Sequence, residues 1–542
     1  MNKASRQHPW SRVVIAFLIS LLVTMIVGIV VHSQIILREI SALGHEVDLG
    51  TRMSSTVSDL LVFAPVFGAI SLALLPAFAL SSFVSRGVNR GLRPVAYALS
   101  GWTAIYAAFR VIDAFAPMPV FLAGTRHWID GLLVASAGAV GGISYSCLTK
   151  RFELRDITRP TITVVSAACS IWIVAILAAS LTRPSVQSIA ASSHSGLKVE
   201  TLASGLPFPW SLAFLPDGRM LITERGGNLR MAASDGRVEE SAVPIAPVSD
   251  FDVLGARLLD VAVDPEFMVN QSIYLSFSHA LAGGDTASLV KGRLTQKGVE
   301  GAAVIFTADP GEQGASVSGG RIAFLEDRTL VFTLGDGFAR REAAQDISNH
   351  RGKSVRLNRD GSVPADNPFV EKQDAALGLY TIGHRHPQGV AVDPRSGRLY
   401  SNEHGARGGD EINLMLPGRN YGWPITTHGI DYSFARITPF AELPGIESPL
   451  FQWTPSVAPS GMAIYAGAEF PDWEGDILVS TLRGRSIRKI EMSDGKPTGQ
   501  QEVLVFDIGA RIRDVRVGPG GGIYFLTDEE VGRLVRVSSA QR

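Results

Sequence analysis

One stretch of the chain, Thr381 to Pro424, concentrates the side chains that can do chemistry. It reads TIGHRHPQGVAVDPRSGRLYSNEHGARGGDEINLMLPGRNYGWP, with glycine, histidine, arginine and carboxylate residues between two strand-like runs. Imidazoles can transfer protons, guanidinium groups bind carboxylates, and oxygen ligands bind hard cations. Polar loops held between apolar strands are typical of a binding surface on a rigid scaffold. We therefore expect this stretch to carry part of a functional site.

The scaffold that positions this stretch is a repeat. Six times after residue 200 a turn signal rich in glycine and aspartate leads into a short alternating apolar run, beginning near residues 216, 264, 326, 393, 473 and 518. Such recurrence of β-branched and aromatic runs indicates radial repetition. It predicts an all-β six-bladed β-propeller over residues 198–542, with its function on the loops around the central channel, and one short helical turn after Gly337.

The first 182 residues have a different composition from the rest. Five segments are apolar and long enough to cross a hydrocarbon layer of about 30 Å, near residues 13–34, 60–84, 95–115, 131–148 and 161–182. We expect an α-helical transmembrane region over residues 1–182, with about five spans, and a linker over 183–197. The apolar part of the first segment is too long for a signal peptide, so we interpret it as a retained anchor.

Basic residues set the expected orientation of these spans. They precede the first segment and follow the second and the fourth, as at Arg12, Arg90 and Lys150. Loops rich in lysine and arginine remain cytoplasmic. An odd number of spans then predicts a protein of the bacterial inner membrane, with a cytoplasmic N-terminus and a periplasmic propeller.

Charge and cysteine content exclude several classes of function. The formal net charge is -1, so no overall basic field attracts nucleic acid. The two cysteines, Cys147 and Cys169, lie in apolar runs, which leaves the soluble part with no disulfide framework and no thiolate metal site.

In the third segment, Arg110 and Asp113 share a helical face near its outer end, where snorkelling to the interface is favoured over a proton or quinone role.

Eight motifs, in the same order along residues 198 to 538, resemble those of aldose sugar dehydrogenases that use pyrroloquinoline quinone (PQQ), the soluble glucose/sorbosone dehydrogenase-like family. They are GLPFPWSLAFLPDGRMLITER, LLDVAVDPEF, GKSVRLNRDGSVPADNPF, GHRHPQG, EHGARGGDEIN, GRNYGWP, APSGMAIY and RIRDV. The resemblance implies a six-bladed propeller that oxidises an aldose at C1. It also implies hydride transfer to PQQ, polarisation of the cofactor by calcium (Ca2+) and a histidine general base.

The resemblance also assigns roles to individual residues. Those expected to bind the cofactor are Arg385, Gln388, Arg483, Arg511 and Arg513, with Arg483 replacing the family's lysine. The calcium site built from two backbone carbonyls corresponds to Gly405 and Ala406. The site of a second, structural calcium in relatives corresponds to Asp410 and Glu411 in this chain. The alternative interpretation of this acidic turn is a loop held by hydrogen bonds.

Three positions depart from the family pattern. Val317 stands where the family has its catalytic histidine, so the general base is absent unless another group supplies it. A family glutamine is lost around Gly255, and Arg257 nearby either compensates by pairing with an anionic quinone or faces solvent. His386 replaces an asparagine and is either a substitute base or a hydrogen-bonding loop residue, and we expect His384 and His404 to orient loops.

Aromatic residues and alternative functions complete the expectations. Trp453 and Tyr421 are candidates to line a site for a flat ligand, whereas Trp423 is expected in the core.

The favoured function is a membrane-anchored sugar oxidoreductase that passes electrons to an acceptor, for which membrane quinone is one candidate. One alternative is a propeller that has lost catalysis and binds or senses a sugar, cofactor or protein, as Val317 suggests. A calcium-dependent lactone hydrolase is the least favoured.

Overall fold

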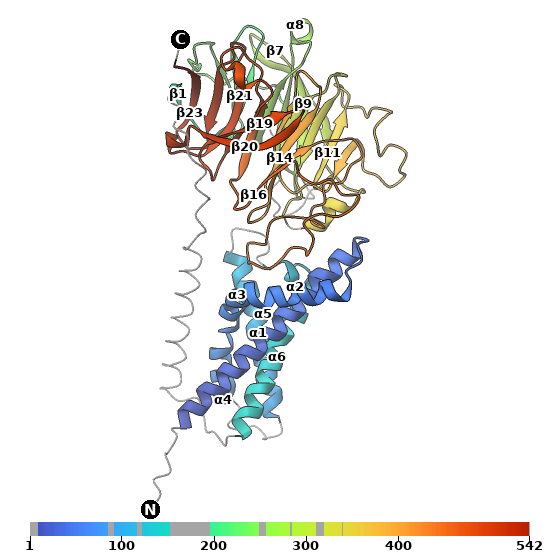
Figure 1. Cartoon of the computed structure of the whole chain (residues 1–542), viewed down its shortest axis with the longest axis vertical. Helices are drawn as coiled ribbons and strands as arrows, with labels where there is room; N and C mark the ends of the chain where they lie inside the picture. The colour runs from blue at the N-terminus through green and yellow to red at the C-terminus, as the bar shows by residue number, and fades with distance from the viewer. Residues whose placement is uncertain are drawn as a thin grey trace, which may run out of the picture. The chain divides into compact units, whose positions relative to one another are not determined.

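The structure is a computed structural model that describes residues 9–84, 92–115, 122–151, 196–248, 256–281, 284–309, 319–338 and 340–540. These residues form a helical unit and a β-propeller unit, each considered by itself (Figure 1). The fifth expected span, at residues 161–182, and most of the expected linker lie outside the described residues.

The helical unit has helices at the first four expected spans. In the described part of the chain, four stretches are long and apolar enough to cross a membrane: Val13–Ala42, Ala64–Val84, Arg93–Phe115 and Trp128–Lys150. The helices are α1 (Pro9–Ala42), α2 (Leu49–Val62), α3 (Ala64–Ser71), α4 (Leu74–Val84), α5 (Arg93–Phe115) and α6 (Trp128–Arg151), with a 3-10 turn η2 (Ala123–Thr125). The second span is therefore built from two consecutive helices, α3 and α4. Helix α2 was not expected, and the Asp48 side chain caps it by accepting the Thr51 amide.

Close packing of α5 against α6 depends on glycine. A Cβ at Gly101 would lie 2.1 Å from the Gly138 carbonyl oxygen, and one at Gly138 would lie 2.2 Å from that of Gly101. Small residues allow helix backbones to approach in this way in membranes. On α5, Arg110 and Asp113 pair with each other at 2.8 Å.

The propeller unit consists, among the described residues, of six antiparallel sheets. Blade 1 contains β2 (Pro209–Phe214), β3 (Met220–Glu224) and β4 (Leu229–Ala232), and blade 2 contains β5 (Arg257–Val263), β6 (Ser272–Leu281), β7 (Gly284–Thr295) and β8 (Gly298–Thr307). Blade 3 contains β9 (Gly319–Phe324), β10 (Leu330–Leu334), β11 (Lys353–Leu357) and β12 (Leu379–Ile382), and blade 4 contains β13 (Pro387–Val392), β14 (Leu399–Glu403), β15 (Asp410–Leu414) and β16 (Phe451–Trp453). Blade 5 contains β17 (Pro459–Ile464), β18 (Ile477–Thr481), β19 (Ile487–Ser493) and β20 (Lys496–Leu504).

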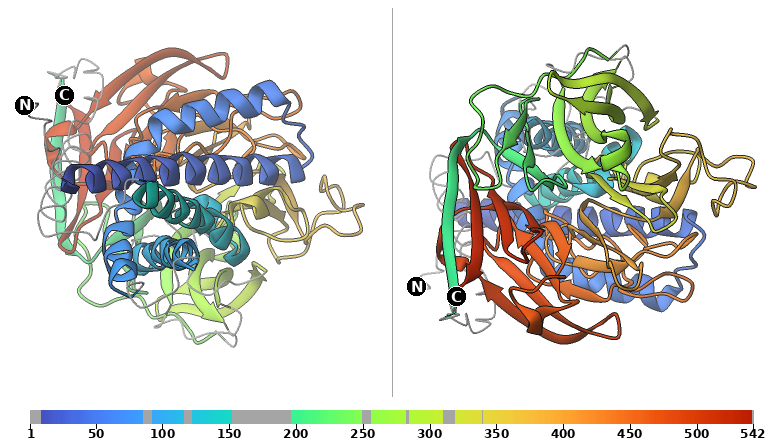
Figure 2. Two further views of the ribbon diagram at one scale, coloured as in Figure 1. Left: turned by 90° about the horizontal axis from the view of Figure 1, so that it is seen from below. Right: turned by 90° about the horizontal axis from the view of Figure 1, so that it is seen from above.

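Blade 6 joins the two ends of the propeller sequence. It contains β21 (Ile512–Val517), β22 (Ile523–Thr527) and β23 (Gly532–Ser539), with β1 (Leu197–Leu206) as its outer strand. Strand β1 pairs antiparallel with β23 from Leu197↔Ser539 to Leu206↔Gly532, and Figure 2 shows it beside the red C-terminal strands. This pairing covers the edge of β23 and closes the ring, which removes a sheet edge that would otherwise be exposed.

The six predicted repeats correspond to the six blades. Each turn signal connects the first and second strands of a blade, as Asp217 does between β2 and β3 and Asp393 does between β13 and β14. Apolar clusters lie between neighbouring blades; for example, Leu258 of β5 and Leu221 of β3 share one cluster. The short helix expected after Gly337 is η4 (Arg341–Gln345).

The first strands of the blades, β2, β5, β9, β13, β17 and β21, line the central channel in this order. They run in the same direction through the blades, so their first residues gather at one mouth of the channel. Gln388 at the start of β13 and Arg513 at the start of β21 therefore lie at the same mouth, together with the loops that follow the second strands.

Candidate functional site

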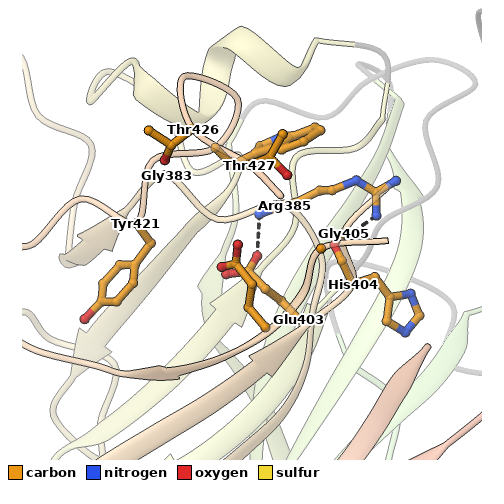
Figure 3. A pocket seen from close by; sticks show the side chains of 11 residues that line it. Gly383, Arg385, Glu403, His404, Gly405, Tyr421, Thr426 and Thr427 are labelled. Carbon is orange, nitrogen blue, oxygen red and sulfur yellow. Dashed lines mark hydrogen bonds between the residues drawn. The ribbon is translucent and has the colours of Figure 1, made fainter. Parts of the chain in front are cut away.

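A single carboxylate, that of Glu403, organises the loop before β13. Its Oε2 accepts the backbone amides of Arg385 at 2.6 Å and His386 at 3.3 Å, and its Oε1 lies 3.0 Å from His384 Nδ1. Figure 3 shows the Glu403 side chain directed at the Arg385 amide. Glu403 is the last residue of β14, whose register places it opposite Pro387, so the hairpin itself brings the carboxylate to the loop. His384 is fully buried between Glu403 and Thr381, which agrees with its expected role in orienting the loop.

Arg385 projects from this loop into a small pocket. Its Nη1 donates to the backbone carbonyl of His404 at 3.0 Å (Figure 3). The guanidinium also lies 5.2 Å from the Phe338 ring and 5.4 Å from the Trp423 ring. Contact with two aromatic rings restrains the guanidinium and keeps water away from it, although its charge remains. The side chain is 4% exposed.

Two imidazoles stack beside Arg385. The rings of His386 and His404 lie 4.8 Å apart at 20°, and His404 Nε2 lies 2.7 Å from the Pro459 carbonyl oxygen. Burial, assisted by the charge of Arg385, lowers the pKa of His404 to about 3. Burial, followed by the effects of His404 and Arg385, lowers the pKa of His386 well below its usual value. Both rings are therefore neutral at pH 7, and in the described part of the chain Nδ1 of His386 has no hydrogen-bond partner.

Three arginines from two segments, one after β3 and one at the start of β21, converge on Asp528, which follows β22. Arg225 donates to it at 2.6 Å, Arg511 at 3.2 Å and Arg513 at 2.8 Å. Burial opposes ionisation of Asp528, but the charges of Arg513 and Arg225 outweigh it, so its pKa lies below the usual value. Three guanidinium groups share one carboxylate, which leaves an excess of positive charge on this cluster. Nη1 of Arg513 also donates to Gln388 Oε1 at 3.1 Å.

The turn between β14 and β15 brings backbone oxygens to the same pocket. Gly405 fits only without a side chain, because a Cβ there would lie 2.0 Å from the Gly408 carbonyl oxygen. Asp410 holds the turn: its Oδ1 accepts the Gly405 amide, and its Oδ2 accepts the amides of Val457 and Ala458. Among the hydrogen bonds of the described residues, none ends on the carbonyl oxygens of Gly405 or Ala406.

Glu411, the second predicted acidic ligand, lies beside Glu403. Asn413 Nδ2 donates to both carboxylates, at 3.1 Å in each case. Burial and the neighbouring charge of Glu403 raise the pKa of Glu411 well above its usual value. The pocket is lined by both glutamates and by Gly383, Arg385, His404, Gly405, Gly409, Tyr421, Trp423, Thr426 and Thr427.

Other predicted residues lie away from this centre. Arg483 follows β18 and is exposed, as is Arg257 at the start of β5. Trp453 is buried in the cluster between blades 4 and 5, where its Nε1 donates to Gln501, so it does not line the pocket. Val317 and Gly255 lie outside the described residues.

Two of the aromatic candidates do line the pocket. Tyr421 stacks on His384 with ring centroids 4.7 Å apart. Trp423 is buried as expected, but it also borders the pocket and donates through Nε1 to Asp336 at 2.7 Å.

Sequence reasoning missed the residues that hold the site together: Glu403, Arg225 and Asp528. Glu403 is part of the EHGARGGDEIN motif, and its place at the end of an expected strand was a usable signal. Arg225 and Asp528 are 303 positions apart and meet only because blades 1 and 6 are neighbours. No local pattern indicates that contact.

Fold and site together define a six-bladed β-propeller with a small pocket that contains Arg385 and two glutamates, and with a separate cluster of arginines around Asp528, at one mouth of its channel. The model of the glucose/sorbosone dehydrogenase family matches residues 206–536. The chain belongs to this family of oxidoreductases. It is 40% identical over 351 residues to the aldose sugar dehydrogenase YliI of Escherichia coli, covering 63% of this chain and 93% of that protein. It is 27% identical over 414 residues to quinoprotein glucose dehydrogenase B of Acinetobacter calcoaceticus, covering 62% and 86%.

Solved structures agree with this assignment. The soluble aldose sugar dehydrogenase of E. coli in its apo form matches with a TM-score of 0.59 and 37% identity, over 63% of this chain and 99% of that one. The PQQ-bound aldose sugar dehydrogenase of Streptomyces coelicolor matches with a TM-score of 0.51 and 25% identity, over 63% and 98%. These comparisons confirm the propeller fold and the family that the motifs indicate.

Proposed function

We propose that this protein is a membrane-anchored oxidoreductase that oxidises aldose sugars at C1, with PQQ as its cofactor and Ca2+ bound beside it. The observation that carries the proposal is the excess of positive charge around Asp528, where Arg511 and Arg513 lie, together with Arg385 beside two neutral imidazoles. The names of the relatives, an aldose sugar dehydrogenase and a quinoprotein glucose dehydrogenase, support the same chemistry.

The residues present fit a planar polycarboxylate such as PQQ. Arg513 is 6% exposed, yet in the described part of the chain its Nε has no hydrogen-bond partner, so it retains a donor for an anionic ligand. Arg385, Gln388 and Arg511 would share this role. When bound, PQQ supplies a quinone carbonyl that accepts a hydride equivalent from the sugar. The carbonyls of Gly405 and Ala406 would hold calcium, which prefers oxygen ligands.

Val317 stands where the family has its catalytic histidine and cannot accept a proton. His386 is the candidate proton acceptor in its place. In the described part of the chain its Nδ1 is buried and has no hydrogen-bond partner, so the neutral ring has an unused nitrogen for a proton, but a pKa well below the usual value makes it a weak base. Burial is the main cause of this low pKa, and an anion beside Arg385 and Arg513 offsets the part of the shift that their charges contribute. We therefore assign His386 the role of base only in the ligand-bound protein.

Reconstitution tests the proposal. Purified full-length protein in detergent is mixed with PQQ and Ca2+ and assayed with an aldose and an artificial electron acceptor. We expect saturable binding of PQQ, and sugar oxidation that requires both PQQ and Ca2+. Absence of both binding and oxidation would overturn the proposal.

A second candidate function is a propeller that binds the same cofactor or a sugar but does not turn over. The weak basicity of His386, together with Val317 in the sequence, favours it. Val317→His discriminates between the two functions. If the wild type binds PQQ without activity and the variant gains turnover, the binding function stands; turnover by the wild type excludes it.

We propose that the protein is anchored in the bacterial inner membrane with a periplasmic propeller; the four apolar helices of the described residues support the anchoring. Such a protein requires an electron acceptor, and we propose membrane quinone. Protease treatment of intact spheroplasts is expected to remove the propeller while sparing the helices. Quinone-dependent reoxidation in membranes should disappear when residues 1–182 are deleted, and unchanged reoxidation would refute the quinone role.

A further inference from the structure

A buried arginine of β9, Arg321, lies in the central channel and has no role in the function proposed above. It is the third residue of β9 and is 1% exposed. Its guanidinium lies 4.0 Å from the ring centroid of Trp210 on β2. A fully buried cation is costly unless it is paired and hydrogen-bonded, so its partners define what it does.

Two of these partners are carboxylates from other blades. Nη1 of Arg321 lies 3.0 Å from Asp514 Oδ1 on β21 and 3.4 Å from Asp260 Oδ1 on β5. A second arginine, Arg516, lies 3.0 Å from Asp514 and 3.4 Å from Asp260. The four side chains form a neutral quartet of two cations and two anions. The carboxylates also accept backbone amides, Asp260 from Ile322 and Asp514 from Leu212, so the quartet ties together the inner strands of blades 1, 2, 3 and 6.

The remaining donors of Arg321 point to the candidate site. Nε donates to the backbone carbonyl of Gln388 at 2.7 Å, and Nη2 donates to that of Arg513 at 3.4 Å. These are the two residues whose side chains bond to each other across the channel mouth. One guanidinium therefore holds the backbones of both, and it is fixed in turn by Trp210, Asp260 and Asp514.

We propose that Arg321 is a positioning residue that sets the separation of Gln388 and Arg513 and thereby the shape of the cofactor site. It does not touch the ligand; it acts through the two backbone carbonyls. Lysine cannot replace it, because a single ammonium cannot reach two carbonyls and two carboxylates in the fixed geometry of a planar guanidinium. We call the contacts of Arg321 with the backbones of Gln388 and Arg513 the brace. The identity of the ligand in this inference rests on the proposed function, whereas the brace does not depend on it.

The test compares Arg321→Lys with a matched control, Arg356→Lys. Arg356 lies on β11 of the same blade, is buried and is paired with Asp327 and Asp366, but it contacts neither Gln388 nor Arg513 in the described structure. We expect Arg321→Lys to bind PQQ about tenfold more weakly in a fluorescence titration, since losing the partners that orient ligand-binding groups typically has an effect of this size. We expect Arg356→Lys to bind as the wild type does. Wild-type affinity in Arg321→Lys, or equal loss in both variants, overturns the proposal.

Two further measurements keep the test decisive. If Arg321→Lys does not fold, Asp514→Asn weakens the quartet while keeping an acceptor for the Leu212 amide, and it should weaken PQQ binding in the same direction; unchanged affinity counts against the brace. Hydrogen exchange of the protein without cofactor provides a readout that is independent of the ligand. Amides of β13 and β21 should exchange faster in Arg321→Lys than in Arg356→Lys. If the wild type binds no PQQ, the proposed cofactor fails, and equal exchange in the two variants would still overturn the brace.

Discussion

Arg513 and Gln388 meet across the channel mouth, with Nη1 of one 3.1 Å from Oε1 of the other, although 125 positions separate them in the sequence. They belong to blades 6 and 4, so neither strand pairing nor a shared turn brings them together. Gln388 is neutral, which leaves the charge of Arg513 compensated mainly by Asp528. This arrangement keeps an arginine available to an anionic ligand.

Gln388→Glu tests that arrangement with almost no change in volume. The new carboxylate pairs with Arg513 and repels the carboxylates of PQQ, so we expect PQQ affinity to fall about tenfold, or about 1.4 kcal/mol. The control is Gln501→Glu, at the outer-strand residue that accepts from Trp453, which should leave affinity unchanged. Titration of both purified variants measures the difference, and undiminished affinity in Gln388→Glu would show that Arg513 does not face the ligand.

Glu403→Gln probes the carboxylate beneath Arg385. The two backbone amides at Oε2 cannot reverse, so the amide oxygen must take that position and the new NH2 group must face His384 and Asn413. We expect the free energy of unfolding to fall by about 1–3 kcal/mol, as for other buried hydrogen bonds left unsatisfied. Glu447→Gln, in a surface ion pair with Arg419, should cost less than about 0.5 kcal/mol. Denaturant unfolding of the two variants provides the comparison, and equal losses would contradict the role of Glu403.

The fold could be predicted from the sequence because its signals are local. In each blade a turn after the first strand leads into an alternating second strand, as at Asp217 and Asp393, and both features lie within about ten residues. The glycine turn at Gly405 and the arginines of RIRDV were likewise found through contiguous motifs. Those motifs identify the residues but not their partners.

Partners from distant strands could not be predicted. Arg225 joins Asp528 and Arg321 joins Asp514 only through closure of the ring, and side-chain contacts at such separations leave no periodicity in a single sequence. The burial of His386 was missed for the same reason. Its low pKa follows from burial first, and then from the effects of His404, Arg385 and Arg513, of which His404 and Arg513 come from other segments.

Lys353 predicts a pH dependence of stability. It lies at the start of β11, fully buried, with Nζ donating to the carbonyls of Ala343 and Arg351. Burial lowers its pKa from 10.5 to about 7. Between these values the unfolded chain binds a proton that the folded chain does not, so the contribution of Lys353 to stability rises with pH from about 7 to 10.5, by up to about 1.4 kcal/mol per pH unit.

The dependence of the unfolding free energy on pH in a Lys353 variant tests this prediction. In Lys353→Met this contribution disappears, so the difference in unfolding free energy between wild type and variant should change in favour of the wild type as the pH rises from 7 towards 10. Lys496→Met, at an exposed lysine of β20, serves as control and should differ from the wild type by a constant amount. Parallel profiles for wild type and Lys353→Met would exclude a neutral buried lysine.

Gly405→Ala tests whether the turn after β14 holds a cation. The added Cβ would lie 2.0 Å from the Gly408 carbonyl oxygen and 2.3 Å from that of Gly409, and both atoms belong to the backbone, so the turn must shift. The shift displaces the carbonyls of Gly405 and Ala406 and strains the bond from the Gly405 amide to Asp410. A ligand that binds only the folded state stabilises it by about 2.7 kcal/mol at one hundred times its Kd. We therefore expect Ca2+ to raise the Tm of the wild type and to have little effect on that of Gly405→Ala.

Gly520→Ala is the matched control, because nothing lies within 4 Å of a Cβ at that turn, and it should keep the full calcium response. An equal response in all three proteins would place the calcium elsewhere in the chain, and no response in the wild type would remove calcium from the proposed site.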